Sequence, residues 1–282
     1  MPPAGNASAP RLAIIAGAGR FPVHVAQEGK RQGCVVVGFG IQGWVDPSLA
    51  AQVDAYEELA VGQIGTLIAR LKAHQVRQVI MAGKVTKEVL LSSRTAFDAE
   101  AQALLRQTTD ASVTSILGAI AARLAREGIT LLDSSTFLKA NLCPEGVLTS
   151  RAPSAAEQDD IRIGFRAARQ MASLDIGQTV VVKGRVVVAV EALEGTDAAI
   201  RRAHTLAGEG LVVVKAAAPR QDRRFDLPVI GTETIATLAA SGVSCLAVEA
   251  GTTLLLDREA LIRAADAARL ALAGITTPSE PS

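Results

Sequence analysis

Apolar strand-like runs and helix-length amphipathic segments alternate along the first half of the chain, from Leu12 to Leu132. The runs LAIIAG, VVVGFG and QVIMAG are typical of buried strands, and the segments between them carry apolar residues at helical spacing. Repeated strand and helix segments indicate a parallel sheet covered by helices on both faces. We therefore predict an α/β fold whose N-terminal domain is a Rossmann-like parallel sheet.

The second half of the chain shows a different pattern, which predicts a mixed α/β domain. A helix is expected over 157–174, with Arg162, Arg166 and Arg169 on its solvent side. The run TVVVKGRVVVAV at 179–190 predicts a β-hairpin with Lys183-Gly184-Arg185 near its turn. Further strands are expected at 211–215, 244–250 and 252–257, and further helices from about 196, around 232–242 and over 258–274.

The length of 282 residues favours two domains. The stretch NLCPEGVLTSRAPSAAEQ contains two prolines and several small polar residues and has no clear periodicity, so we place the interdomain linker there. A linker of this kind would permit hinge motion. The predicted organisation is a disordered lead-in at 1–10, an N-terminal domain at 11–142, a linker at 143–158 and a C-terminal catalytic domain at 159–282.

Composition excludes several classes of function. The 29 Lys and Arg residues nearly balance the 28 Asp and Glu residues, so nucleic acid is not an expected partner. Aromatic residues make up only 3%, which disfavours base-stacking surfaces. Three widely separated cysteines indicate a reducing compartment, and no apolar run approaches the ~18 residues that span a bilayer. We expect a soluble cytoplasmic protein, with the first apolar run as a strand rather than a signal peptide.

The first strand leads into the turn AGAGRFP, which contains Gly17 and Gly19. Backbone amides at such a strand-to-helix junction can bind phosphate. Pro22 stands at the third glycine of the dinucleotide fingerprint, and VVVGFG ends without an acidic residue, so NAD or FAD is disfavoured. The alternatives are a tight structural turn or a contact with phosphate or sugar. Lys84 follows the strand QVIMAG, so it is either a ligand contact beside the Gly17 turn or an exposed lysine.

Carboxylates follow the second half of the predicted hairpin, in the segment EALEGTD. Thr196 or Asp197 could cap the next helix. A helix cap does not require Glu191 or Glu194. One or two carboxylates together with substrate phosphates are typical ligands of Mg²⁺. The segment is therefore either a helix cap alone or a helix cap combined with a metal site.

Polar residues also stand at or after the ends of other apolar strands. These are Lys215, Asp226 in the stretch QDRRFDLPVIG, and Glu249. That stretch could be a polar loop before a strand, with Pro228 as a boundary. The sequence contains no HxxxH, CxxC, GxSxG or P-loop motif. The remaining carboxylates, lysines and arginines favour metal-assisted phosphoryl or phosphoanhydride chemistry.

Several of these segments, in this order, resemble the LpxI family of UDP-2,3-diacylglucosamine pyrophosphatases. They are LDIGQ at 174–178, VEALEGTD at 190–197, Lys215, QDRRFDLPVIG at 221–231 and VEAG at 248–251, together with IAGAGRFP at 15–22 and AGKV at 82–85. The resemblance implies hydrolysis of UDP-2,3-diacylglucosamine to 2,3-diacylglucosamine 1-phosphate (lipid X) and UMP in lipid A biosynthesis. It also implies dependence on Mg²⁺ or another divalent cation such as Mn²⁺, and lipid binding between two domains.

The resemblance places the family's essential aspartate at Asp226, as a metal ligand or water-orienting base. We assign Lys215 and Arg224 to charge stabilisation, and Glu191 and Glu194 to the metal with Asp226. The residues expected to bind substrate are Gly17, Gly19, Lys84, Gln178, Thr196 and Gln221.

Two positions depart from the family pattern. Ala218 and Arg220 flank Pro219 where relatives commonly carry a second lysine before the proline, and Thr109-Asp110 replaces an acidic pair. Arg220 could supply the missing charge on a different side chain. The expected partners are the lipid nucleotide, the inner-membrane surface through transient contact, and a second copy in a homodimer. A nucleotide-dependent oxidoreductase and a non-catalytic nucleotide-sugar or lipid-binding protein stay open as alternatives.

Overall fold

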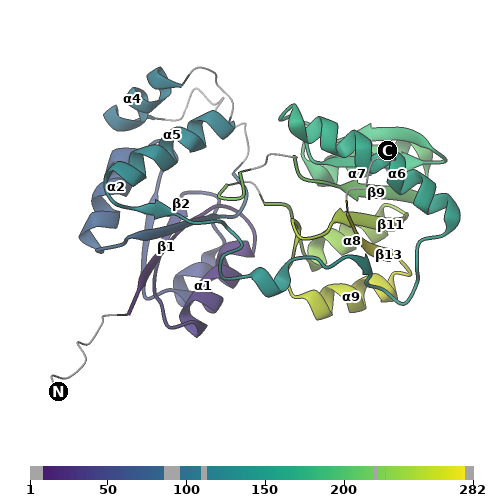
Figure 1. The fold of residues 1–282 in the computed structure, drawn as a ribbon, viewed down its shortest axis with the longest axis horizontal. Coiled ribbons are helices and arrows are strands. Elements are labelled where there is room, and N and C mark those ends of the chain that lie inside the picture. Colours follow the sequence, from purple (N-terminus) through teal and green to yellow (C-terminus); the bar gives the residue numbers. More distant parts are fainter. Residues whose placement is uncertain (1–8, 86–95, 109–112, 219–221, 226, 277–282) are drawn as a thin grey trace, which may run out of the picture. The chain divides into compact units, whose positions relative to one another are not determined.

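The computed structural model describes residues 9–85, 96–108, 113–218, 222–225 and 227–276 (Figure 1). These residues form two compact units. The first comprises the described residues up to Leu138 together with Arg223–Phe225, and the second comprises Lys139–Asp222 and the described residues after Phe225. The predicted fold class is confirmed, because a parallel sheet lies in the N-terminal part and a mixed sheet in the C-terminal part.

The sheet of the first unit has the order β3-β2-β1-β4-β5, and every neighbouring pair is parallel. Its central strands are rich in Val, Ile and Ala and are buried on both faces, as expected for parallel strands covered by helices. The edge strand β3, AYEEL, was not predicted because its two glutamates hide the strand pattern. The strands are β1 Arg11–Ala16, β2 Val35–Ile41, β3 Ala55–Leu59, β4 Gln78–Ala82 and β5 Thr130–Leu131.

Helices cover both faces of this sheet. Gly29 of α1 packs against Leu12 and Val36 on one face. On the other face, Ala13 and Val37 join a core with apolar residues of α2, α4 and α5. The helices of this unit are α1 Phe21–Arg31, the 3₁₀ helix η1 Pro47–Gln52, α2 Ile64–Ala73, α4 Ala99–Gln107 and α5 Val113–Arg126.

The sheet of the second unit is mixed, with the order β6-β13-β11-β9-β7-β8. Strands β9, β11 and β13 are parallel, whereas β7 runs antiparallel to both β8 and β9. The predicted hairpin is confirmed, with Gly184 and Arg185 in the left-handed conformation at its turn. The strands are β6 Gly146–Val147, β7 Thr179–Lys183, β8 Val186–Val190, β9 Leu211–Lys215, β11 Val243–Glu249 and β13 Ala271–Ile275, and β10 Val229–Ile230 pairs separately with β12 Leu254–Leu255.

Each face of this sheet has its own core. Phe165 and Ala168 of α6 pack with alternate valines of β7 and β9 on one face. Gly164 allows the close approach of α6, because a Cβ atom there would lie 2.6 Å from Val214. The other face packs against three helices. The helices of this unit are the 3₁₀ helix η2 Lys139–Asn141, α6 Ala155–Ser173, α7 Thr196–Ala207, α8 Thr232–Ala240 and α9 Arg258–Ala267.

The stretch 143–158, expected to link two domains, lies within the second unit. It contributes the buried Cys143, strand β6 and the first turn of α6. Arg151 binds both carboxylate oxygens of Glu157 at 2.9 and 2.8 Å, and Glu157 also accepts a hydrogen bond from the Ser244 hydroxyl. The small polar residues and prolines of this stretch therefore belong to an irregular segment that is packed within the second unit.

The predicted helix over 258–274 is wrong beyond Ala267. Arg269 has a φ of 54°, which ends α9, and residues 271–275 form β13 beside β11. The alanine-rich sequence suits either conformation, and pairing with the buried strand β11 decides between them.

Candidate functional site

Two glycine-containing loops pack against each other where β1 and β4 end. The amide of Lys84 donates to the carbonyl of Ala18 at 2.9 Å, and the amide of Ala18 donates to the carbonyl of Lys84 at 2.8 Å. A Cβ atom on Gly17 would lie 2.6 Å from the Lys84 carbonyl oxygen, and one on Gly83 would lie 2.7 Å from the Gly17 carbonyl oxygen. The predicted proximity of the Gly17 and Lys84 turns is confirmed. The close approach of the two backbones explains why residue 17 is a glycine.

These loops lie at the carboxyl edge of the parallel sheet, at the point where the strand order reverses. Ligands bind at this position in open α/β sheets. Gly19 has a φ of 89°, and the Lys84 residue is exposed. Such loops suit contact with a phosphate or a sugar, and the substrate-binding roles of Gly17, Gly19 and Lys84 stay predictions.

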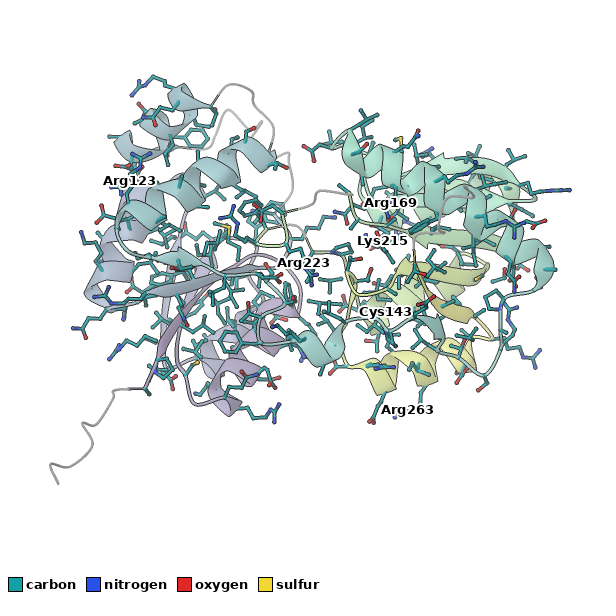
Figure 2. All side chains as sticks on the ribbon, in the orientation of Figure 1. Arg123, Cys143, Arg169, Lys215, Arg223 and Arg263 are labelled. Carbon is teal, nitrogen blue, oxygen red and sulfur yellow. The ribbon has the colours of Figure 1, made fainter. Side chains whose placement is uncertain are left out.

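A second group of polar side chains gathers at one edge of the mixed sheet, and we call it the Lys215 cluster. It consists of Lys215 at the end of β9, Thr179 at the start of β7, Thr196 at the start of α7, and Glu191 directly after β8. The Lys215 ammonium lies 3.3 Å from the Thr196 hydroxyl and 3.4 Å from the Thr179 hydroxyl. The antiparallel arrangement of β7 with β8 and β9 brings these residues together, because Thr179 pairs with Lys215 in the sheet. Figure 2 labels Lys215.

The Glu191 carboxylate is held by hydrogen bonds on both oxygens. Oε1 accepts from the Thr196 hydroxyl at 2.7 Å, and Oε2 accepts from the Gln178 amide at 3.3 Å. Burial raises the pKa of Glu191, but the charge of Lys215 and hydrogen bonds from Thr179, Thr196 and Gln178 outweigh it, so the pKa is lowered. Glu191 is therefore a carboxylate at neutral pH, in contact with hydroxyls and near a cation.

Thr179 was not predicted as a site residue. It is 1% exposed, and it begins an otherwise apolar strand just after the LDIGQ segment. A hydroxyl at the first position of a buried strand is a weak signal, because threonine also favours strands on its own account. Only the pairing of β7 with β9 identifies its partner.

The loop after Lys215 is anchored by a buried carboxylate. Glu249, which is 9% exposed, accepts a hydrogen bond from the Ala217 amide at 2.8 Å and one from Arg169 Nη1 at 3.1 Å. The prediction that Arg169 lies on the solvent side of its helix is wrong, since its side chain is partly buried and forms an ion pair with Glu249. Arg162 and Arg166 are exposed as predicted. A buried carboxylate needs a cation, and helical periodicity alone does not reveal that need.

Glu194 has different partners from Glu191. Its carboxylate binds Arg202 at 2.6 Å and accepts from the Ala192 amide at 3.1 Å, and the residue is exposed. Among the described residues no group of three His, Cys, Asp or Glu residues is placed to hold a metal ion.

The stretch QDRRFDLPVIG is only partly described. Gln221 and Asp226, predicted for substrate binding and catalysis, lie outside the described residues, as do Asp110 and Arg220. Arg224 belongs to the three-residue segment grouped with the first unit, and its guanidinium lies 5.1 Å from the centre of the Phe225 ring. Their predicted roles stay predictions.

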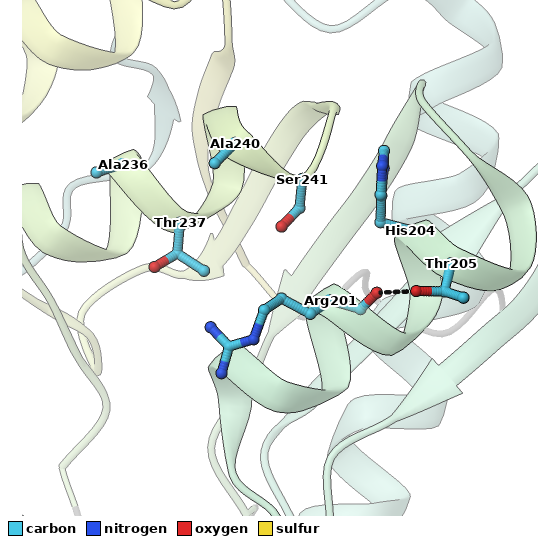
Figure 3. Close-up of a pocket in the computed structure, with 7 residues that line it drawn as sticks. All are labelled: Arg201, His204, Thr205, Ala236, Thr237, Ala240 and Ser241. Carbon is cyan, nitrogen blue, oxygen red and sulfur yellow. Dashed lines mark hydrogen bonds between the residues drawn. The ribbon is translucent and has the colours of Figure 1, made fainter.

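A groove of about 560 Å³ lies between α7 and α8 of the second unit (Figure 3). Its lining residues are Arg201, His204, Thr205, Ala236, Thr237, Ala240 and Ser241. None of them belongs to the Lys215 cluster, and none carries a carboxylate. We do not place the reaction in this groove.

Comparison with known proteins matches both parts of the chain to one family. The profile of the LpxI N-terminal domain matches residues 11–141, and that of the LpxI C-terminal domain matches residues 144–273. These matches define a protein built from the two LpxI domains in that order. The UDP-2,3-diacylglucosamine pyrophosphatase LpxI of Caulobacter vibrioides is 32% identical over 96% of this chain and 99% of its own length. The chain belongs to the LpxI family.

Likeness to solved structures is weak. The CobK precorrin-6A reductase covers 97% of this chain and 90% of its own at 14% identity, with a TM-score of 0.33. A biotin carboxylase from Campylobacter jejuni covers 71% of this chain and 42% of its own at 13% identity, with a TM-score of 0.28. Neither likeness contributes to the assignment of the fold or the site.

Proposed function

We propose that this chain hydrolyses the pyrophosphate bond of UDP-2,3-diacylglucosamine to 2,3-diacylglucosamine 1-phosphate and UMP, with the help of a divalent cation. The observation that carries the proposal is the Lys215 cluster, which lies within the part of the chain matched by the LpxI C-terminal profile. The name of the Caulobacter relative supplies the substrate. A cation and hydroxyl donors grouped around a carboxylate suit a reaction on charged phosphate oxygens.

In this proposal, side chains of the Lys215 cluster and of the segments around 178 and 221–226 have separate roles. Lys215 neutralises charge that develops on the phosphate oxygens, and Arg224 does the same from the segment before Asp226. Thr196, Gln178 and Gln221 bind the substrate. Glu191 holds the Thr196 hydroxyl in place, and Thr196 in turn contacts the Lys215 ammonium.

The residues present fit a metal in part. Glu191 is ionised, and its two oxygens have about four lone-pair positions for the hydrogen bonds from Thr179, Thr196 and Gln178, so it can contribute one oxygen ligand. Mg²⁺ uses one or two carboxylates together with substrate phosphates, and Asp226 is the proposed second carboxylate. We omit Glu194, because its ion pair with Arg202 would have to break. When bound, the metal supplies charge neutralisation on the pyrophosphate.

Exposed apolar residues flank the Lys215 cluster and suit a lipid substrate. Leu174 and Ile176 lie in the loop before β7, and Leu193 lies in the loop after β8. Gly177 packs so closely on the backbone of Glu191 that a side chain there would overlap it, which brings the two loops together. The described helices include none long and apolar enough to cross a membrane. We propose that the protein acts in the cytoplasm and that these residues touch the inner-membrane surface transiently, with a homodimer as a further proposal.

The test is release of UMP and lipid X from UDP-2,3-diacylglucosamine, with Mg²⁺ or with EDTA. Release should require the metal and should be lost in Asp226→Asn. Asp159→Asn is the matched control, because Asp159 is a partly exposed carboxylate of α6 paired only with Arg162 in the described contacts. If folded wild-type protein binds the nucleotide but releases no UMP with any divalent cation, the chain is a binding protein.

A further inference from the structure

A turn of the first unit, residues 133–135, binds the segment Arg223–Phe225. Ser134 is 1% exposed, and its amide donates to the Arg223 carbonyl at 2.9 Å. Its hydroxyl lies 2.9 Å from the carbonyl oxygens of Arg224 and of Met81 on β4. The Ser134 amide therefore binds the Arg223 carbonyl, and the hydroxyl, with its single proton, lies within hydrogen-bonding distance of both the Arg224 and the Met81 carbonyl oxygens.

The side chain of Arg223 is bound to the same turn. Its Nε lies 3.1 Å from Asp133 Oδ2, and its Nη2 donates to the Ser135 hydroxyl at 3.1 Å. Among the described residues the Nε–H has no acceptor in hydrogen-bonding geometry, so the contact with Asp133 is ionic. Asp133 Oδ1 in turn accepts from the Ser135 amide and hydroxyl at 2.7 and 2.6 Å, so the turn is stabilised by its own hydrogen bonds.

Phe225 completes the attachment through apolar contacts. Its ring packs against the core formed by the first unit's sheet with α2, α4 and α5. The segment is thus bound by main chain at Arg223 and Arg224 and by side chain at Arg223 and Phe225. Contacts with two successive carbonyls orient two successive peptide planes of the segment Arg223–Phe225.

The residue that follows Phe225 in the sequence is Asp226, and consecutive Cα atoms are about 3.8 Å apart. We propose that Ser134, supported by Asp133, is a positioning residue for the hydrolysis, because it anchors residues 223–225, which immediately precede Asp226 in the sequence. This proposal rests on the proposed function. Misplacement of a reacting group by about 1 Å can cost roughly 100-fold in rate, so the loss of this anchor should lower turnover.

The first variant is Ser134→Ala, which removes the hydroxyl contacts and keeps the amide. We expect kcat to fall about 10- to 100-fold with KM changed less than about 3-fold. Asp133→Asn should act in the same direction, since it weakens the hold on Arg223. The matched control is Ser244→Ala, which removes a partly buried hydroxyl bound to Glu157 and to a carbonyl in the second unit. The control should lose stability but keep kcat.

A second readout is independent of activity. Trypsin cleaves after Arg223 and Arg224, and cleavage of a folded protein requires local opening. Ser134→Ala should speed cleavage at these two bonds about fivefold, the effect of one lost hydrogen bond, while cleavage after Arg185 in the β7–β8 turn stays unchanged. Mass spectrometry of the early fragments identifies each bond.

Unchanged cleavage at Arg223 and Arg224 in Ser134→Ala would overturn the anchoring. Faster cleavage with normal kcat would overturn the positioning role, and so would an equal loss of kcat in Ser244→Ala. Wild-type protein that releases no UMP refutes the proposed function and with it any role in hydrolysis. The cleavage rates would still show separately whether the turn anchors the segment.

Discussion

The hydroxyl of Thr196 donates a hydrogen bond of 2.7 Å to the carboxylate of Glu191, across the connection between β8 and α7. The same hydroxyl lies 3.3 Å from the Lys215 ammonium. Thr196 therefore stands between the anion and the cation of the cluster. Thr196 is the first residue of α7, and in the tertiary structure its hydroxyl also contacts both Glu191 and Lys215.

Thr196→Val keeps the shape of the side chain and removes the hydroxyl. We expect kcat/KM to fall about 10- to 100-fold. Glu191 and Lys215 both contact the Thr196 hydroxyl, and its loss would shift side chains whose exact positions determine the rate. The pKa of Glu191 should rise, since a hydrogen bond that lowers it is gone, so the acid limb of the pH–rate profile should move to higher pH. The measurement is UMP release across pH.

The control for that variant lies on the same helix. Thr205 donates its hydroxyl to the Arg201 carbonyl at 3.1 Å and is exposed (Figure 3). Thr205→Val should leave both kcat/KM and the acid limb unchanged. Equal losses in the two variants would contradict the role of Thr196.

Glu157 should make stability depend on pH. The hydrogen bond from Arg151 leads the causes that lower its pKa from 4.5 to about 2. A carboxylate with a depressed folded-state pKa contributes stability above pH 4.5, and this contribution is lost as the pH falls from 4.5 towards 2. The contribution is at most about 3 kcal/mol at neutral pH. Urea unfolding at several pH values should show the slope, and Glu157→Gln should reduce it and lower stability at pH 7.

Glu259→Gln is the matched control for this experiment. Glu259 and Arg263 form an exposed pair at 3.8 Å on α9, and such pairs contribute about 0–1 kcal/mol. The control should therefore keep the acid slope of the wild type. If Glu157→Gln also keeps it, another carboxylate causes the acid sensitivity.

Gly17→Ala tests the close approach of the two loops in the first unit. The added Cβ would lie 2.6 Å from the Lys84 carbonyl oxygen, so one loop must move. We expect a loss of about 1–3 kcal/mol in the free energy of unfolding, the usual cost of overpacking. Gly118→Ala in α5 is the control, because the space around it is open and it should be neutral or stabilising by up to about 1 kcal/mol. Wild-type stability in Gly17→Ala would show that the loops are further apart.

Local sequence patterns predicted much of the architecture. Alternating apolar runs predicted the parallel sheet, and the KGR turn predicted the β7–β8 hairpin. The strand before AGKV placed Lys84 beside Gly17. These predictions succeed because periodicity, glycine content and strand ends are local properties of the chain.

Long-range pairing decided the rest. Residues 268–274 suit a helix by composition, yet 271–275 pair with β11 as a strand. Arg169 occupies a helical position expected to be solvated, and it turns inward because the buried Glu249 needs a cation. The pairing with β11 joins residues that helix α9 separates in the chain, and Glu249 is 80 residues from Arg169, so local sequence patterns do not predict either contact.

By itself, the sequence determined the class of fold, the family and the residues with chemical capacity. Tertiary structure decided which of them meet. Thr179 joins Lys215 because β7 and β9 are paired, and Ser134 holds Arg223 and Arg224 through contacts between residues 89 and 90 positions apart in the chain. The physical reason is that hydrogen bonds and ion pairs act over a few ångströms, and strand order sets which distant residues come that close.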